Sequence, residues 1–204
     1  MISRRDWLVL SCALLAGCGR RRFRKLVAGD AILAVGDSLT AGFGAPKGAD
    51  YPAQLAQILG HKVINGGVSG DTSAQALARL PDLLVQKPKL VVVSIGGNDF
   101  LQRQPESGTR ENIRKMVADI RATGVPAVLV AIPHFTTGVL LGMVSEHPLY
   151  AELANELDVP LLQGAWAEIL GDKDLKSDAV HANAAGYRLF AEKLAGFLKK
   201  LGLV

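Results

Sequence analysis

The chain has 204 residues, of which 49% are hydrophobic and 21% charged, and its formal net charge is +4 at pH 7. That length and composition suit a single globular domain with a sizeable core, and the small excess of positive charge gives no indication of nucleic acid binding. Both cysteines, Cys12 and Cys18, lie near the N-terminus, so we expect no disulfide in the domain and no zinc site built from cysteine and histidine. The sequence has neither a Walker A loop nor G-x-G-x-x-G after a strand, so we expect no nucleotide cofactor.

The first 17 residues have the layout of an export signal. Arg4 and Arg5 precede an apolar stretch that is shorter than the roughly 20 residues needed to span a membrane. The sequence "LLAGC" at Leu14–Cys18 resembles the lipoprotein box of bacterial lipoproteins, in which cleavage before the cysteine is followed by its acylation. We therefore expect a signal peptide at residues 1–17 and a lipid on Cys18. A plain secretory signal with an incidental cysteine is the alternative.

Residues 18–29 read as a tether between this lipid and the domain at residues 30–204. The tether carries the basic cluster "RRRFRK" at Arg20–Lys25, and each basic residue near an anionic membrane surface contributes about 1 kcal/mol to binding. The resemblance implies an exported lipoprotein on the periplasmic face of the cell envelope. Gly19 differs from the usual inner-membrane retention signal and favours the outer membrane. "SRRDWL" at Ser3–Leu8 also resembles a twin-arginine export signal.

Beyond the tether, predicted strands and helices alternate about five times. Short apolar runs closed by turn residues predict strands at Ala31–Val35, Lys62–Ile64, Lys89–Gly97, Pro126–Ile132 and Val159–Leu162. Helical spacing of apolar residues predicts helices at Tyr51–Leu59, Ser73–Leu84, Thr109–Thr123, Tyr150–Leu157 and Asn183–Leu201. Pro81 lies inside the second of these helices, where a proline can interrupt the helix, so this helix could be split in two. The alternation predicts an α/β fold, with a parallel sheet covered by helices on both faces.

Ligands of such sheets bind beyond the carboxyl ends of the strands, so the residues that follow each strand are the candidates for chemistry. After the first strand, Gly36 permits a sharp turn and Ser38 offers a hydroxyl nucleophile. The alternative is that Ser38 only caps a following helix. Asp37 and Asp99 each follow a strand, and we expect them to bond backbone N–H groups and hold turns rather than to act as catalytic acids.

A base for Ser38 is predicted just before the last helix. Asp178 and His181 are three residues apart in "SDAVHANAAGY" at Ser177–Tyr187, a spacing at which the carboxylate can reach an imidazole nitrogen. The alternative is a turn-capping aspartate beside a surface histidine. Only His181, of the four histidines, has an acid three residues before it.

Donors for an oxyanion are predicted at two other strand ends. "NGGVSGDT" at Asn65–Thr72 is rich in glycine, which can present its backbone N–H at close range. "GGND" at Gly96–Asp99 places the amide of Asn98 beyond the most apolar strand, where it can serve as a neutral donor. Turn formation alone would explain either segment by itself.

The segments "GDSL", "GVSGDTS", "GGND" and "DAVH", in this order, resemble the signature blocks of the GDSL/SGNH hydrolases. The likeness runs from Asp30 to about Leu201, and it is greatest to the bacterial thioesterase I, lysophospholipase and arylesterase group. It implies a flavodoxin-like three-layer α/β/α sandwich with a five-stranded sheet. It also implies a nucleophile at Ser38, completed by His181 and Asp178, and an oxyanion hole formed by Gly70, Asn98 and the N–H of Ser38. Neither a metal nor another cofactor is implied.

The segment Pro133–Pro148 follows a strand and is rich in apolar residues. It is either a wall of the pocket for an acyl or aryl group, with Phe135, Leu140, Leu141 and Met143 as lining residues, or a short helix packed on the sheet. The function we expect is hydrolysis of a small-molecule or lipid ester or thioester. Two alternatives remain: removal of acetyl groups from envelope glycans, and a non-catalytic lipoprotein that binds ligands on the same fold.

Overall fold

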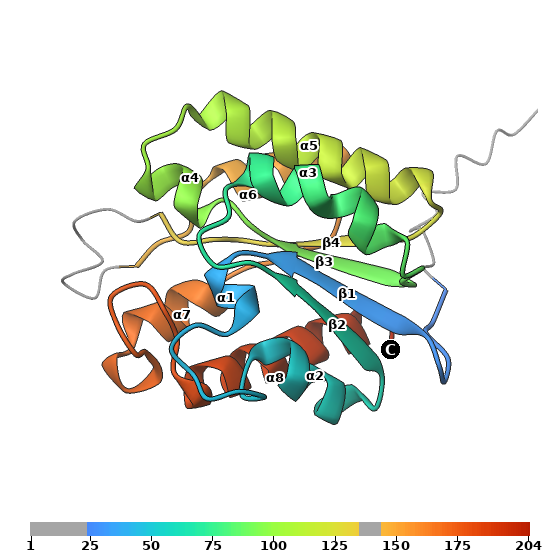
Figure 1. The fold of residues 1–204 in the computed structure, drawn as a ribbon, viewed down its shortest axis with the longest axis horizontal. Coiled ribbons are helices and arrows are strands. Elements are labelled where there is room, and N and C mark those ends of the chain that lie inside the picture. The colour runs from blue at the N-terminus through green and yellow to red at the C-terminus, as the bar shows by residue number, and fades with distance from the viewer. Residues whose placement is uncertain (1–23, 135–143) are drawn as a thin grey trace, which may run out of the picture.

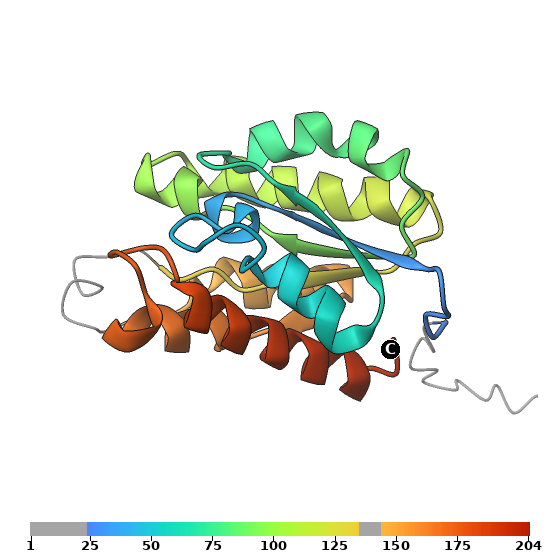
Figure 2. The same ribbon diagram turned by 60° about the horizontal axis from the view of Figure 1, so that its bottom comes forward.

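A five-stranded parallel sheet runs through the structure, and helices cover both of its faces (Figures 1 and 2). The computed structural model describes residues 24–134 and 144–204, so the expected signal peptide and Cys18 lie outside the described residues. No helix in these described ranges is long and apolar enough to cross a membrane. The three-layer α/β/α architecture confirms the fold class predicted from the alternation of elements.

The strands are ordered β2-β1-β3-β4-β5, so the sheet grows outward from β1 in both directions. The strands are β1 (Ala31–Gly36), β2 (Lys62–Gly67), β3 (Leu90–Ser94), β4 (Ala127–Val130) and β5 (Leu161–Leu162). Strand β2 lies on one side of β1, and β3 lies on the other side, so the strand order reverses between β2 and β3. The carboxyl ends of β1 and β3 therefore diverge into loops that leave room for a ligand at that edge.

The helices divide between the two faces of the sheet. They are α1 (Ser38–Ala41), α2 (Tyr51–Leu59), α3 (Ser73–Leu84), α4 (Gly97–Leu101), α5 (Glu106–Ala122), α6 (Leu149–Leu157), α7 (Ala165–Gly171) and α8 (Ala184–Lys200), with a 3₁₀ turn at Lys173–Leu175. Helices α3, α5 and α6 pack together on one face, and α2, α7 and α8 on the other (Figure 1).

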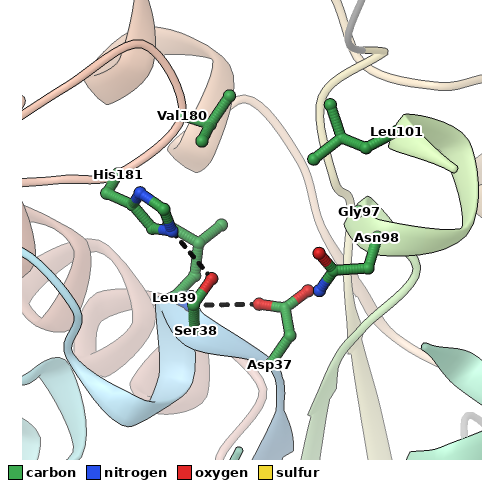
Figure 3. A pocket seen from close by; sticks show the side chains of 8 residues that line it. All are labelled: Asp37, Ser38, Leu39, Gly97, Asn98, Leu101, Val180 and His181. Carbon is green, nitrogen blue, oxygen red and sulfur yellow. Dashed lines mark hydrogen bonds between the residues drawn. The ribbon is translucent and has the colours of Figure 1, made fainter. Parts of the chain in front are cut away.

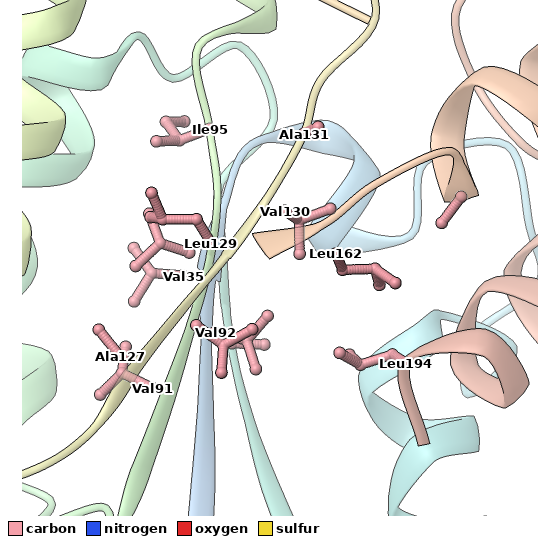
Figure 4. Close-up of a cluster of buried hydrophobic side chains, with 14 of the residues drawn as sticks. Val35, Val91, Val92, Ile95, Ala127, Leu129, Val130, Ala131, Leu162 and Leu194 are labelled. Carbon is pink, nitrogen blue, oxygen red and sulfur yellow. The ribbon is translucent and has the colours of Figure 1, made fainter. Parts of the chain in front are cut away.

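The core lies on both sides of the central strands. Every residue from Ile32 to Gly36 is buried, and so are all residues of β3 and β4. Their side chains alternate between the two faces of the sheet, as Figure 4 shows for Val35, Val91 and Val92. Burial on both faces explains why these strands read as continuous apolar runs rather than as alternating patterns.

Several boundaries and elements differ from the sequence-based prediction. Strand β2 extends to Gly67, because it pairs with β1 along its whole length. Strand β3 ends at Ser94, because Gly96 has a φ of 120° and helix α4 begins at Gly97. Pro81 does not divide α3, since the buried face of this helix offsets the roughly 3 kcal/mol cost of an internal proline. The short elements α1, α4, α7 and the 3₁₀ turn were not predicted, because they carry no periodic pattern of apolar residues.

Two paired glycines allow α1 to pack directly on the ends of β1 and β2. Gly36 and Gly67 are in register, and a Cβ at Gly67 would collide with the backbone of Thr40 and Ala41. A Cβ at Gly36 would collide with the Thr40 side chain and the Ser94 carbonyl. Gly36 is not among the glycines with positive φ. Its importance is therefore the lack of a side chain rather than the sharp turn that we expected.

Candidate active site

Ser38 is the first residue of α1 and does not cap it. The cap is Asp37, whose carboxylate accepts the N–H of Leu39 at 3.0 Å. The cap interpretation of Ser38 is therefore wrong, and its Oγ is free for another partner. That partner is Nε2 of His181, which lies 2.9 Å from Oγ (Figure 3).

His181 and Asp178 form one compact unit in the loop before α8. Nδ1 of His181 lies 2.8 Å from Oδ2 of Asp178. The same carboxylate accepts the backbone N–H groups of Val180 and His181, each at 2.9 Å. Asp178 thus orders both the backbone that carries the imidazole and the imidazole itself, as the three-residue spacing predicted.

These hydrogen bonds keep Asp178 ionised. Burial acts to raise the pKa of Asp178, but the bonds from Val180 and His181 outweigh it and hold this pKa below its usual value. An ionised carboxylate can fix the imidazole so that Nδ1 carries a proton and Nε2 accepts one.

Contacts with the rest of the domain hold this loop in place. Ser177 donates its backbone N–H to the His181 carbonyl at 2.9 Å, and Asn183 donates its N–H to the Leu175 carbonyl at 2.9 Å. A side chain at Gly186 would collide with that same Leu175 carbonyl. The ring of Phe43 lies 4.5 Å from the His181 ring, between centroids. The loop is therefore packed from several sides.

Asn98 lies across the cleft from His181, at the start of α4 (Figure 3). One hydrogen of its amide Nδ2 is donated to the Asp71 carbonyl at 2.9 Å, which fixes the amide and leaves the second hydrogen for a ligand. Gly70 precedes Asp71 in an exposed turn with a φ of 88°. No acceptor among the described residues takes the N–H of Ser38 or of Gly70.

The described part of the cleft is small, with a volume of about 60 Å³. Its lining residues are Asp37, Ser38, Leu39, Gly97, Asn98, Leu101, Val180 and His181. Gly70 is not among them. Leu101 and Val180 point toward one another above Ser38 (Figure 3). Neither was predicted as a cleft residue, because neither belongs to a periodic pattern. The predicted pocket residues Phe135, Leu140, Leu141 and Met143 lie outside the described residues.

Of the two aspartates expected to hold their own turns, Asp37 does so, whereas Asp99 lies within α4 and binds distant segments instead. Asp37 binds the nearby N–H of Leu39, whereas Asp99 binds the N–H of Ser73 at 2.8 Å and the hydroxyl of Thr109 at 3.1 Å. Asp99 therefore ties α4 to the starts of α3 and α5. No group of three or more potential ligands for a metal ion occurs within residues 24–134 and 144–204.

The model of the GDSL-like lipase/acylhydrolase family matches residues 34–189, which include Ser38, Asn98, Asp178 and His181. The chain belongs to this family. As a GDSL-like acylhydrolase it is a carboxylic ester hydrolase, which confirms the enzyme class that the sequence motifs implied.

Relatives of the same family share most of the chain. It is 34% identical over 181 residues to the thioesterase 1/protease 1/lysophospholipase L1 of Escherichia coli K12, with 87% of each chain covered. The solved structure of TesA is similar with a TM-score of 0.74 and 28% identity, over 84% of this chain and 99% of that one. Esterase EstA of Pseudoalteromonas sp., solved with bound inhibitor monoethylphosphonate, has a TM-score of 0.72 and 25% identity, over 84% and 97% of the two chains.

Asp37 should make the stability of this acylhydrolase depend on pH. Burial raises the pKa of Asp37 from 3.8 to about 7, against the effect of the Leu39 hydrogen bond. Between these two values the folded protein binds a proton that the unfolded chain does not, so the free energy of unfolding falls as the pH rises through this window. Each pKa unit corresponds to about 1.4 kcal/mol, which gives a decrease of up to about 4 kcal/mol.

Asp37→Asn should remove this pH dependence while keeping an acceptor for the Leu39 N–H. Urea unfolding of both proteins at several pH values from about 4 to 8 measures the difference. The wild type should lose stability relative to the variant as the pH rises, and parallel curves would contradict the assignment.

Proposed function

We propose that this acylhydrolase is a serine esterase in which Ser38, His181 and Asp178 form the catalytic triad. The observation that carries the proposal is the continuous chain of hydrogen bonds from Ser38 Oγ through the imidazole to Asp178. In such a chain the hydroxyl can lose its proton to Nε2 while Oγ attacks a carbonyl carbon. Asp178 stabilises the imidazolium that forms.

The attack moves a pair of electrons onto the carbonyl oxygen. The N–H groups of Ser38 and Gly70 and the second amide hydrogen of Asn98 would bind this oxyanion, and preorganised donors of this kind provide much of the stabilisation in acyl transfer. When the tetrahedral intermediate collapses, the ester bond breaks and the leaving alcohol or thiol takes the proton from His181. Water then attacks the acyl-enzyme by the same route, which releases the carboxylic acid and regenerates Ser38.

The substrate class follows from the relatives and from the cleft. The relatives bear thioesterase, lysophospholipase and esterase names, which support a small-molecule or lipid ester or thioester as the substrate. Leu39, Leu101 and Val180 give the described cleft an apolar border that suits an acyl chain. Those names lend no support to glycan deacetylation or to a non-catalytic binding role.

Ser38→Ala should reduce the kcat for hydrolysis of short p-nitrophenyl esters by roughly 10⁴-fold or more, because the hydroxyl bonded to His181 is removed. Circular dichroism should show an unchanged fold. Ser107→Ala, which alters an exposed serine on α5, serves as the matched control and should leave activity unchanged. Wild-type activity in Ser38→Ala would refute the triad.

We also propose that the chain is an exported lipoprotein of the cell envelope, acylated on Cys18. The support is the "LLAGC" sequence together with the direction of entry: residues 26–30 lead into the amino end of β1, at the opposite end of the sheet from α1 (Figure 1). An anchor at that end would leave the cleft facing away from the membrane.

Cys18→Ala should move the protein from the membrane fraction to the soluble fraction and abolish its labelling by radioactive palmitate. The matched control is Cys12→Ala. Cys12 lies within the expected signal peptide, so the protein carrying this substitution should remain membrane-bound. Palmitate labelling that survives in Cys18→Ala would contradict the proposal.

A further inference from the structure

One guanidinium joins three segments that surround the candidate nucleophile. Nε of Arg79, on α3, lies 2.6 Å from Oδ2 of Asp71. Nη1 donates to the Gly66 carbonyl at 2.5 Å, and Nη2 donates to the Gly36 carbonyl at 2.8 Å. Arg79 therefore binds the ends of β1 and β2 and the loop between β2 and α3 at the same time.

These contacts are largely protected from water. The side chain of Arg79 is 22% exposed and that of Asp71 is 10% exposed. Charged pairs in such surroundings hold their geometry better than exposed pairs, because water screens them less and the planar guanidinium fits several acceptors at once. The Gly36 carbonyl directly precedes Asp37 of the candidate site, and the Gly66 carbonyl lies at the end of β2, from which the chain leads to Gly70.

The Gly36 carbonyl belongs to the peptide that leads into Asp37 and Ser38. It accepts both Arg79 Nη2 and the N–H of Val68 at 3.2 Å, so it joins the nucleophile turn to the start of the glycine-rich loop. In that loop, Asp71 donates its N–H to the Val68 carbonyl at 3.2 Å, and Gly70 has the positive φ that a type II turn requires at its third position.

Asp71 connects this turn to two helices, α3 through Arg79 and α4 through Asn98. Its carboxylate pairs with Arg79, and its carbonyl accepts the amide of Asn98. The three expected oxyanion donors come from separate segments, and each of those segments is bound by Asp71, by Arg79 or by both. Among the described residues, the Asp71 carbonyl is the one hydrogen-bond acceptor of the Asn98 side-chain amide.

We propose that Arg79 and Asp71 are positioning residues that set the separation of the oxyanion donors of Ser38, Gly70 and Asn98. Neither residue touches the reacting atoms. The proposal rests on the function proposed above and adds to it that the donor geometry depends on a largely buried ion pair between Arg79 on α3 and Asp71 in the loop before α3. Misplacing donors by about 1 Å can cost on the order of 100-fold in rate.

The effect should fall on the transition state rather than on substrate binding. Arg79→Gln removes the charge and at least two of the three contacts, so the kcat for a p-nitrophenyl ester should fall by about 10- to 100-fold while KM stays within about twofold. Arg79→Lys, which keeps the charge near Asp71 but cannot reach both carbonyls, should retain more activity than Arg79→Gln. Asp71→Asn keeps its carbonyl for Asn98 and should lose less than Arg79→Gln.

A double-mutant cycle with Asn98→Ala separates positioning from a general loss of stability. If both residues serve the same oxyanion, the loss of kcat in the double variant should be clearly smaller than the product of the two single losses. Independent, multiplying losses would overturn the proposal. All assays are run below the thermal transition of each variant, and if Arg79→Gln does not fold, Asp71→Asn and Arg79→Lys take its place in the cycle.

Arg114→Gln is the matched control, since it breaks ion pairs with Glu111 and Glu156 on the outer surface of α5 and α6 and should keep full kcat. Ser38→Ala is assayed beside these variants. If it is inactive while Arg79→Gln keeps wild-type kcat or changes only KM, the positioning role is wrong and the triad stands. If Ser38→Ala is active, the proposed function itself fails.

Discussion

The close approach of α1 to the ends of β1 and β2 determines the arrangement of the candidate site. Gly36 and Gly67 leave no room for a side chain between the strands and this helix. Because α1 begins at the very end of β1, Ser38 lies at the edge of the sheet where β1 and β3 diverge. At the same strand ends, the Gly36 and Gly66 carbonyls accept hydrogen bonds from Arg79 on α3. A larger residue at either glycine would displace Ser38 and its surroundings together.

The two halves of the site are built in different ways. Asp178 organises His181 through bonds within four consecutive residues, so this half is largely a property of one loop. The proposed oxyanion donors Ser38, Gly70 and Asn98 come from three segments separated by about 30 residues each, and their placement depends on contacts between segments. We therefore expect the second half to be the more sensitive to substitutions away from the cleft, since small shifts of packed elements change every distance between them.

The fold could be predicted because its central strands are buried on both faces and read as apolar runs, and because α8 carries a clear helical pattern. The pairing of Asp178 with His181 could be predicted because it is local. The roles of Gly36, Arg79 and Leu101 could not. They arise from the packing of segments distant in the sequence: a glycine needed for space looks like a glycine needed for a turn, and an arginine that binds backbone carbonyls leaves no pattern in the sequence. Short helices such as α4 are set by tertiary contacts, here those of Asp99.

We expect His181 to activate Ser38 for attack on electrophilic acyl-like centres. Reaction of the folded protein with a fluorophosphonate, followed by peptide mass spectrometry, measures this activation. A single adduct should form on Ser38, much more slowly in His181→Ala, and none should form when the wild type is unfolded before labelling. An adduct on another residue, or a catalytically active wild type that stays unlabelled, would show that Ser38 is not the activated nucleophile.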